Sequence, residues 1–249
     1  MEILKGESLK KYFGEVKAVD GVTISFEKGS TVSIVGPNGA GKTTLLNLFT
    51  GHFKPTSGKI YFEGKDVTAL SPNKRSKLGM GRAFQLVNLF EDFTVSDNIK
   101  ISIASVLGKT GRFFSFFDRD KELNSMTEEV LSLFNLSEKA NFKAKDLSHG
   151  ERKLLDVAIA TSLNPRLLFL DEPTSGVSTA DKTPIMEMLK AVIKKKGLTV
   201  IMVEHDLGVV FNYSDRVVVM HEGKVLADGE PESLKTDIKV LEVLVGGKL

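Results

Sequence analysis

The sequence predicts an α/β fold in which helices cover a parallel sheet and a helical lobe interrupts it. Short apolar runs, typical of strands that are buried on both faces of a parallel sheet, recur along the chain. Helical periodicity fills several of the intervals between these runs. From about residue 94 to residue 162 the pattern is mostly helical, and strands return with Leu167. The apolar runs are residues 31–36, 166–172, 199–205 and 215–223.

Further strands and helices can be assigned from local patterns. Residues 21–26 alternate like a half-buried strand, and the glycine-bounded stretches 58–64 and 223–229 are typical of hairpins. Residues 41–51 and 181–197 show helical spacing, and the second of these stretches ends in three lysines and a glycine, as helices commonly do.

We expect one domain, residues 1–249, with a helical part inserted into its core. The α/β core is expected in residues 1–93 and 163–249, and the helical subdomain in residues 94–162. The tail, residues 237–247, predicts an amphipathic helix that covers the core.

The composition excludes several kinds of protein. Lys and Arg number 34 against 32 for Asp and Glu, so no overall positive field draws the chain to nucleic acid. The chain has no Cys, which excludes disulfides and thiolate metal sites. Its first residues lack the apolar segment of a signal peptide, and no stretch approaches the roughly 18 apolar residues of a membrane span. A membrane role therefore requires a partner.

The strongest motif is "GPNGAGKTT", residues 36–44, which fits G-x-x-x-x-G-K-[ST] between a predicted strand and a predicted helix. Its glycines let the backbone wrap around phosphates, so that N–H groups and the helix N-terminus face the anion. Lys42 places a positive charge on the β- and γ-phosphates, and the Thr43 hydroxyl reaches Mg²⁺. The motif predicts a nucleoside triphosphate site.

An acidic pair follows the apolar run of "LLFLDEP" at the carboxyl end of a predicted buried strand, where α/β proteins bind ligands. Asp171 fits the role of holding Mg²⁺ through water, and Glu172 is placed to polarise an attacking water. Without the phosphate-binding loop, a strand that ends in a polar turn would explain the pair equally well.

Two polar residues stay open on local sequence alone. His205 follows another apolar run, where it would donate a hydrogen bond to the γ-phosphate or to the water, yet an isolated His is more often a polar loop residue. The Gln85 amide is able to ligate Mg²⁺ and orient water, although a surface Gln is the simpler interpretation.

The stretch "DLSHGERK" predicts a helix start. Ser148 and Glu151 stand three residues apart before an apolar run, which is the capping-box pattern. Such a start also directs backbone N–H groups at an anion.

Taken in order, "GPNGAGKTT", "FQ", "LSHGE", "LLFLDEP" and "VEHD" resemble the ATP-binding subunit of ABC transporters over nearly the whole chain. "GRAFQLVNLFEDFTVSDNI" and the Phe-rich "GRFFSFF" most resemble ATPase subunits of high-affinity branched-chain amino acid importers, and relatives of that group serve amides and urea. The resemblance implies a P-loop (RecA-like) ATPase core, an antiparallel β subdomain and an inserted helical subdomain. It also implies that two subunits stack head to tail around two ATP molecules.

The resemblance carries roles to matching positions. Glu172 would be the catalytic base and His205 the switch residue, while Gln85 would sense the γ-phosphate and link to the permease. Phe13 would stack on adenine, with Tyr12 as a neighbouring candidate. The nucleotide-binding residues would be Phe13, Gly36, Asn38, Gly39, Gly41, Lys42, Thr43 and Thr44. Thr43, Gln85 and Asp171 would hold Mg²⁺. The signature that acts on the partner subunit's ATP would be Ser148, His149, Gly150 and Glu151.

The chain departs from the family pattern at three positions. His149 replaces the second signature Gly, for which this importer group has precedent, and Glu151 replaces the terminal Gln. Ser178 stands where many members have Asp, which affects the expected contacts between subunits more than hydrolysis. The aromatic cluster in residues 113–117 either packs the helical lobe or contacts a permease, and residues 86–95 are the better candidate for that contact.

The expected partners are a second ATPase subunit, identical or paralogous, integral-membrane permease subunits and, indirectly, a solute-binding protein, with no nucleic acid. The expected location is cytoplasmic, on the inner face of the cell membrane through the permease. The expected function is that of an ATPase subunit that powers an amino acid importer. The alternatives are the ATPase of a lipid or lipopolysaccharide exporter, a soluble ABC ATPase that acts on nucleic acid or ribosomes, and an ATP-binding module that hydrolyses poorly. The balanced charge and the intact Glu172 and His205 argue against the last two.

Overall fold

The computed structural model describes residues 1–83, 89–109 and 120–245, which build two β-sheets and the helices around them. The larger sheet has six strands in the order β10-β9-β3-β8-β7-β6. Neighbouring strands are parallel except for β10, which forms an antiparallel hairpin with β9. These strands are β3 (Thr31–Val35), β6 (Met80–Ala83), β7 (Leu167–Asp171), β8 (Thr199–Val203), β9 (Arg216–His221) and β10 (Lys224–Gly229).

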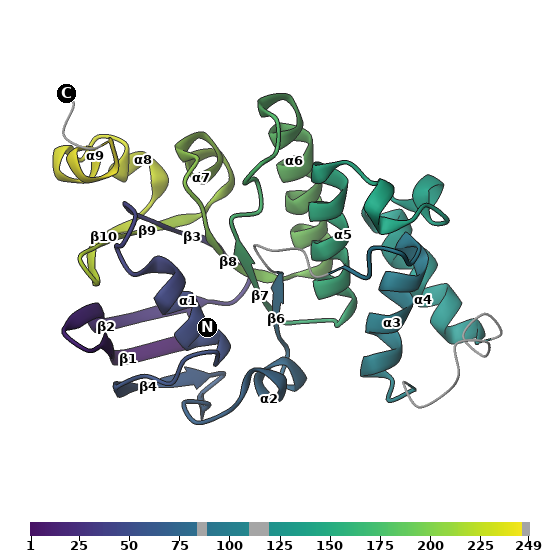
Figure 1. The fold of residues 1–249 in the computed structure, drawn as a ribbon. Helices are drawn as coiled ribbons and strands as arrows, with labels where there is room; N and C mark the ends of the chain where they lie inside the picture. The colour runs from purple at the N-terminus through teal and green to yellow at the C-terminus, as the bar shows by residue number, and fades with distance from the viewer. Residues whose placement is uncertain (84–88, 110–119, 246–249) are drawn as a thin grey trace.

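The smaller sheet is antiparallel and has the order β2-β1-β4-β5. Its strands are β1 (Glu2–Phe13), β2 (Val16–Glu27), β4 (Ser57–Phe62) and β5 (Lys65–Asp66). In Figure 1 it lies below the larger sheet, and helix α1 (Lys42–Thr50) fills the space between the two. Leu45, Leu46 and Phe49 of α1 are fully buried in the hydrophobic core that both sheets share.

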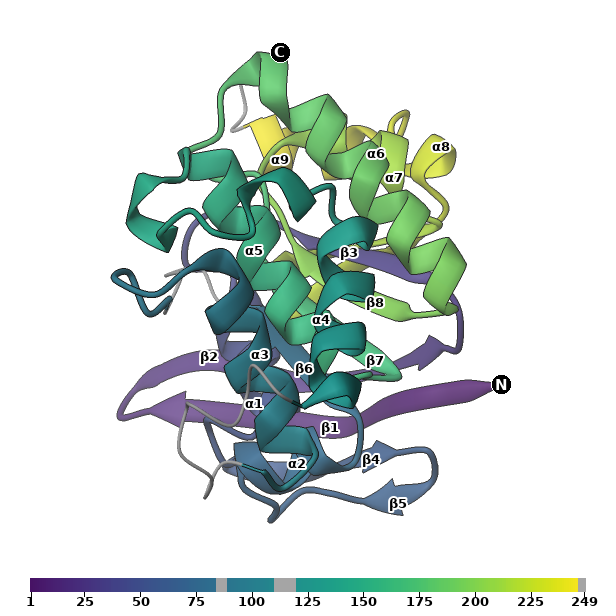
Figure 2. The same ribbon diagram turned by 90° about the vertical axis from the view of Figure 1, so that its right-hand side faces the viewer.

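The other helices cover the opposite face of the six-stranded sheet or extend beyond its edge. The turned view in Figure 2 shows α3, α4 and α5 as neighbours, and we call these three helices the helical lobe. Their core is continuous with that of α6 and with one face of β7 and β8. The helices are α2 (Pro72–Lys77), α3 (Val95–Val106), α4 (Lys121–Leu133), α5 (His149–Ser162), α6 (Thr179–Lys196), α7 (Leu207–Tyr213), α8 (Pro231–Leu234) and α9 (Ile238–Val245).

The predicted fold class is confirmed. Every residue of β7 and β8 is buried, as expected for central strands that are covered on both faces. The predicted helix in the tail is α9, whose Val240 is 1% exposed and packs against β9 and α7. The division of the chain at residues 94 and 162 stays a prediction, although α3 begins at Val95 and α5 ends at Ser162. In the described residues, no helix combines the length and apolarity that a membrane crossing requires.

Among the strand ends that differ from the predicted runs, those of β7 and β8 concern the site. β7 ends at Asp171 because Glu172 has a positive φ of 53°, which interrupts the extended backbone. β8 ends at Val203, two residues before His205, because the Glu204 side chain accepts hydrogen bonds from the following backbone N–H groups.

Candidate active site

The phosphate-binding loop connects β3 to α1, and close contacts fix its shape. Gly36 and Gly41 have φ values of 148° and 98°. A Cβ atom at these positions would lie 2.2 Å from the Met220 carbonyl oxygen and 2.1 Å from the Ala18 carbonyl oxygen, respectively. Only glycine therefore fits at either position. The sequence places both glycines where strands β2 and β9 approach the loop.

Lys42 lies inside the curve of this loop. Its ammonium group donates hydrogen bonds to the Gly36 carbonyl at 2.7 Å and the Pro37 carbonyl at 3.0 Å. Burial lowers its pKa, and the nearby charges of Glu172 and Asp171 partly offset this effect. The loop thus holds a buried positive charge at the N-terminus of α1, where the helix dipole also favours an anion.

A pocket of 490 Å³ opens over the loop and brings most of the predicted residues together. The predicted residues that line it are Phe13, Asn38, Gly39, Gly41, Lys42, Thr43, Thr44, Glu172 and His205. Sequence reasoning missed Val16, Lys17, Ala18, Ala40 and Glu222. Three of these, Val16, Lys17 and Ala18, begin strand β2, and Glu222 lies in the β9–β10 turn; their approach to the loop is a feature of the fold and not of any local motif. Gly36 lies beneath the loop and shapes it from there.

Phe13 stands at the edge of this pocket. Its side chain is 45% exposed, and its ring packs edge-on against Phe53 with the ring centroids 5.4 Å apart. The ammonium group of Lys11 lies 5.0 Å from the Phe13 centroid. Tyr12 is not among the described lining residues, because its hydroxyl donates a hydrogen bond to Asp20 instead. Of the two aromatic candidates, Phe13 therefore has the exposed ring next to the phosphate-binding loop.

Glu172 and His205 are hydrogen-bonded to each other. His205 Nε2 lies 2.9 Å from Glu172 Oε1, and since a carboxylate only accepts, the imidazole N–H is the donor. The Glu172 backbone N–H donates to the Val203 carbonyl at 2.9 Å, which ties the turn after β7 to the end of β8. The Glu172 side chain is 17% exposed and that of His205 is 44% exposed, so the pair lies at a wall of the pocket open to solvent.

Asp171 is the buried end of β7, and its two oxygens differ. Oδ2 accepts a hydrogen bond from Arg82 Nη2 at 2.8 Å, and the side chains of Asp171 and Arg82 are 2% and 13% exposed. Oδ1 has no hydrogen-bond partner within the described residues. Arg82, which sequence reasoning missed, also donates to Asn47 Oδ1 at 2.7 Å and Thr50 Oγ1 at 3.2 Å, both on α1.

The hard oxygen donors here suit Mg²⁺, which keeps several waters and needs one or two protein oxygens. The unpartnered Asp171 Oδ1 and the exposed Thr43 hydroxyl supply such oxygens. No group of three or more His, Cys, Asp or Glu in the described residues forms a denser metal site. The third predicted ligand, Gln85, lies outside the described residues, as does the aromatic cluster in residues 113–117.

The stretch "LSHGE" begins α5, and the predicted capping box is confirmed. Ser148 Oγ accepts from the Glu151 N–H at 3.3 Å, and Glu151 Oε2 accepts from the Ser148 N–H at 2.9 Å. Glu151 also pairs with Lys139. Burial alone would raise the pKa of Glu151, but hydrogen bonds from Lys139 and Ser148 outweigh it and hold this pKa below its usual value. Glu151 is therefore engaged within its own chain.

The signature helix also contacts the turn that carries Glu172. His149 Nε2 donates to the Ser175 carbonyl at 3.1 Å, and Lys153 Nζ, four residues further along α5, donates to the Glu172 carbonyl at 3.3 Å. Ser148 and His149 are exposed, and none of the signature residues lines the pocket over the phosphate-binding loop. Within the described residues, this chain's signature is therefore not part of its own pocket lining.

Ser178 caps helix α6. Its hydroxyl accepts from the Asp181 backbone N–H at 3.3 Å and donates to the Asp181 carboxylate at 2.6 Å. Ser and Asp are both effective N-cap residues, so the departure from Asp at this position preserves the helix start.

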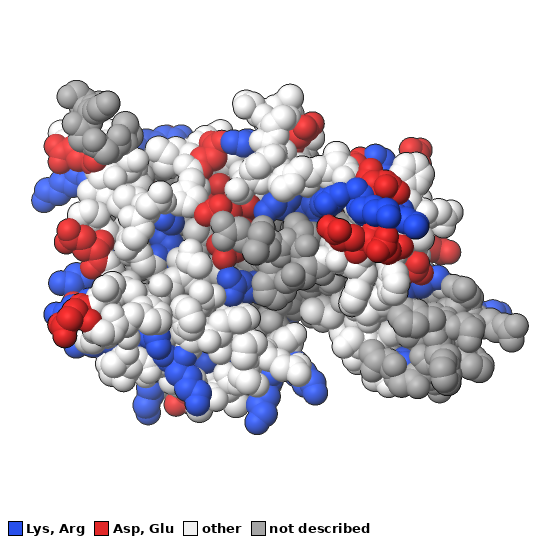
Figure 3. Space-filling model, in the orientation of Figure 1, with Lys and Arg blue, Asp and Glu red and all other residues white. Residues whose placement is uncertain are grey.

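Charged side chains surround the start of α5. Lys145 pairs with Asp92 at 2.8 Å, and Arg152 approaches Glu91 at 3.7 Å. Figure 3 shows basic and acidic side chains in contact on this face, to the right of its centre. These pairs join the start of α5 to the segment before α3.

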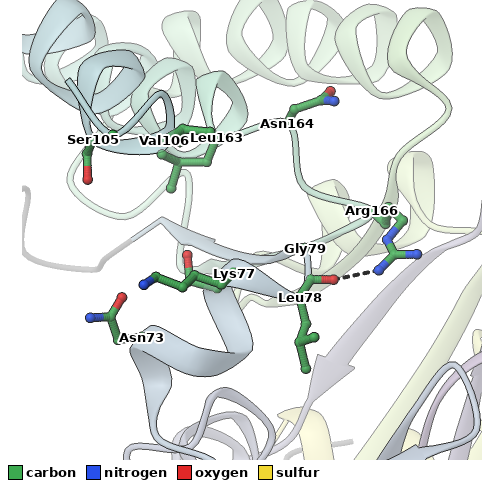
Figure 4. A pocket seen from close by; sticks show the side chains of 11 residues that line it. Asn73, Lys77, Leu78, Gly79, Ser105, Val106, Leu163, Asn164 and Arg166 are labelled. Carbon is green, nitrogen blue, oxygen red and sulfur yellow. Dashed lines mark hydrogen bonds between the residues drawn. The ribbon is translucent and has the colours of Figure 1, made fainter.

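A larger cavity, of 690 Å³, lies between α2, the end of α3 and the connection from α5 to β7 (Figure 4). None of its described lining residues is acidic or belongs to the phosphate-binding loop. Arg166 in this cavity donates to the Leu78 carbonyl at 2.6 Å and pairs with Glu63 at 2.5 Å. The larger cavity therefore lacks the groups that the smaller pocket combines, which are the phosphate-binding loop, the Glu172 carboxylate and the His205 imidazole.

Comparison with known proteins agrees with this geometry. A family model described as "ABC transporter" matches residues 19–175. A probable branched-chain amino acid transport ATP-binding protein LivG of Methanocaldococcus jannaschii is 36% identical, with 99% of this chain and 98% of that protein covered. The high-affinity branched-chain amino acid transport ATP-binding protein BraF of Pseudomonas aeruginosa is 32% identical, with 98% of each covered.

Solved structures show the same fold. A nucleotide-free ATP-binding cassette from an ABC transporter is 35% identical, covers 98% of each chain and superposes with a TM-score of 0.83. A dimeric cassette in a post-hydrolysis state, bound to ADP and Pi, is 27% identical, covers 92% of this chain and 99% of that chain, and has a TM-score of 0.77. With its phosphate-binding loop, acidic pair and signature helix, this chain belongs to the ATP-binding subunits of the ABC transporter family.

Proposed function

We propose that this chain is the ATP-hydrolysing subunit of a membrane importer for branched-chain amino acids or related small polar solutes. The observation that carries the proposal is the pocket in which the phosphate-binding loop faces the Glu172–His205 pair. Cargo is assigned from the printed names of the relatives, which are branched-chain amino acid transport ATP-binding proteins.

In the proposed complex, the triphosphate of ATP lies along the loop. Backbone N–H groups of the loop and the N-terminus of α1 face it, and Lys42 neutralises charge on the β- and γ-phosphates. The exposed ring of Phe13 offers adenine a stacking surface at the edge of the pocket.

Hydrolysis is a direct displacement at the γ-phosphorus. The oxygen of a water forms a bond to this phosphorus while the bond to the β–γ bridging oxygen breaks, which gives ADP and phosphate. The Glu172 carboxylate accepts the water's proton, and His205 holds this carboxylate through its Nε2–H at 2.9 Å. Thr43 and, through water, Asp171 would hold Mg²⁺, which when bound neutralises developing charge on the phosphates.

The signature serves a second subunit. Ser148, Gly150 and the N-terminus of α5 would contact the γ-phosphate of the partner's ATP. Two observations support this: Ser148 is exposed, and it is not among the described residues that line this chain's own pocket. A homodimer or a dimer with a paralogous subunit both satisfy this arrangement. Dimeric cassettes among the similar structures support the proposal.

We place the permease contact at residues 86–95 and their neighbours. Of these, Phe90 and Phe93 are 54% and 38% exposed, and their rings stack with centroids 5.4 Å apart. Phe142 is 51% exposed, and its carbonyl accepts a hydrogen bond from the Val95 N–H at 2.9 Å. Exposed aromatic residues that lie close together suit an apolar partner surface. Through this contact the subunit would act from the cytoplasmic face of the membrane, with a solute-binding protein outside.

The first experiment tests hydrolysis. Glu172→Gln should slow ATP hydrolysis by about 100-fold or more, because the amide does not accept the water's proton, while ATP binding persists. Steady-state phosphate release and a nucleotide-binding titration measure the two quantities. Normal turnover in this variant would remove Glu172 from the proposed role.

The second experiment tests the signature. In the Glu172→Gln background, ATP should drive dimerisation, and adding Ser148→Arg should abolish it because Arg obstructs the partner's phosphate. Ser132→Arg, on the exposed surface of α4, is the matched control. Sedimentation velocity with and without ATP separates monomer from dimer, and an unchanged dimer with Ser148→Arg would refute the signature's role.

The third experiment tests cargo. Right-side-out vesicles, with the subunit and ATP enclosed, the permease in the bilayer and the binding protein outside, should accumulate leucine only when the enclosed ATP is present, and Glu172→Gln should stop this uptake. Lipid extraction without leucine uptake would instead assign the chain to an exporter.

A further inference from the structure

We propose that Glu204, a buried acid with no part in the steps above, is the positioning residue that holds His205 against Glu172. The inference rests on the proposed function, because it assumes that these two residues carry out hydrolysis. Glu204 directly follows β8 and is 3% exposed. It lies just beyond the carboxyl end of β8, where Val203 pairs with Asp171 at the end of the adjacent parallel strand β7.

One oxygen of Glu204 binds the turn after β7. Oε1 accepts from the Thr174 backbone N–H at 2.9 Å and from the Thr174 hydroxyl at 2.6 Å. Thr174 lies two residues after Glu172, so this oxygen fixes the turn that presents the catalytic carboxylate. That turn contains the positive φ of Glu172, a conformation that a residue other than glycine keeps only when its surroundings enforce it.

The other oxygen binds the turn after β8. Oε2 accepts from the His205 backbone N–H at 2.9 Å and from the Asp206 N–H at 3.4 Å. One carboxylate therefore holds both turns at once, and its bonds are satisfied only when the turns lie side by side. The same proximity lets His205 Nε2 reach Glu172 Oε1 at 2.9 Å.

The burial of the Glu204 carboxylate favours the arrangement in which both turns donate hydrogen bonds to it. A buried carboxylate is costly unless hydrogen bonds satisfy it, and bonds to an ionised acceptor are about twice as strong as those between neutral groups. Within the described residues Glu204 forms no ion pair with a Lys or Arg, so the four donors of the two turns are what stabilises its charge. Separation of the turns would leave this charge buried without donors.

The substitution that tests the proposal is Glu204→Gln, which keeps the size of the side chain but places an NH₂ group against backbone N–H donors. We expect kcat for ATP hydrolysis to fall about tenfold or more, as small displacements of catalytic groups do, with KM for ATP changed less than about twofold. Thr174→Val, which removes one donor at the other end, should lower kcat in the same manner but less. Thr174→Ser keeps both donors and should restore turnover. Glu242→Gln, on the exposed side of α9, is the control for an acid-to-amide change.

A double-mutant cycle separates positioning from general stability. If Glu204 acts through His205, Glu204→Gln should lower kcat little further in the His205→Ala background. If the two residues act independently, the fold-losses in kcat of the two single variants should multiply in the double variant. Multiplicative losses, or a Thr174→Val variant with normal kcat, would overturn the inference. If Glu204→Gln does not fold, as circular dichroism shows, Thr174→Val and its cycle with His205→Ala carry the test. Normal turnover in both Glu172→Gln and His205→Ala would instead refute the proposed function itself.

Discussion

The buried ion pair between Arg82 and Asp171 offers the sharpest test of what stabilises the site. Arg82→Met removes the only ion-pair partner that the described residues give Asp171, whose side chain is 2% exposed, and also two hydrogen bonds to α1. Removing one member of a buried pair typically destabilises a protein by about 3–5 kcal/mol, because the remaining charge stays buried. By contrast, an exposed pair such as Lys196–Glu129 contributes about 1 kcal/mol or less.

The assay is urea unfolding followed by circular dichroism, since the chain has no Trp to report by fluorescence. With a slope of about 3 kcal/mol per molar urea, Arg82→Met should lower the midpoint by roughly 1–1.7 M. Lys196→Met should lower it by less than roughly 0.4 M on the same scale. Adding Asp171→Asn to Arg82→Met should recover part of the loss, because the uncompensated charge is gone. Equal shifts for Arg82→Met and Lys196→Met would refute the reasoning.

Three further outcomes are expected. Phe13→Ala should weaken ATP binding about tenfold by removing a stacking surface, whereas Tyr12→Phe should change the affinity less than about twofold. Calorimetric titration compares the two variants, and a larger loss of affinity in Tyr12→Phe would assign the adenine contact to Tyr12. The buried guanidinium of Arg75 donates to four backbone carbonyls. Burial lowers the pKa of Arg75 to about 10, so the side chain is still charged at neutral pH. Arg75→Met should lower the unfolding free energy in urea by about 3 kcal/mol or more, because the carbonyls lose their donors. Because the folded pKa of Glu151 is lowered, its stabilising contribution is present above the unfolded value near 4.3 and is lost as pH falls through the folded pKa. The urea midpoints of wild type and Glu151→Gln should therefore differ at pH 7 and converge as pH falls below the folded pKa, and a constant difference would contradict this account.

Continuous apolar runs predict the strands whose burial is complete. β7 and β8 are apolar throughout because helices cover both faces of the sheet at their positions. β6 was missed because its four residues include Arg82 and a glycine, and only its pairing with β7 makes it a strand. β1 was missed because Ser8, with a φ of 46°, and the register shifts around it break the alternation of the strand.

The site divides in the same way. The phosphate-binding loop is predictable because adjacent residues build it, whereas Lys17, at the start of β2, and Glu222, in the β9–β10 turn, lie near it only in the folded structure. Local sequence left His205 open, and its place 2.9 Å from Glu172 depends on the register of β7 and β8. Arg82 and Glu204 carry no motif, since Arg82 pairs with Asp171 on another strand and Glu204 accepts from Thr174 in a turn 30 residues earlier.

The two contacts from α5 to the Glu172 turn have a mechanical consequence. His149 and Lys153 are about one helical turn apart, and they grip the backbone at Ser175 and at Glu172. Two hydrogen bonds restrict both translation and rotation of this turn relative to α5, which a single hydrogen bond would not do. A rotation of the helical lobe would therefore move this turn. In the proposed dimer, this would couple the position of the Glu172 carboxylate, beside one ATP, to the helix whose N-terminus would contact the other ATP.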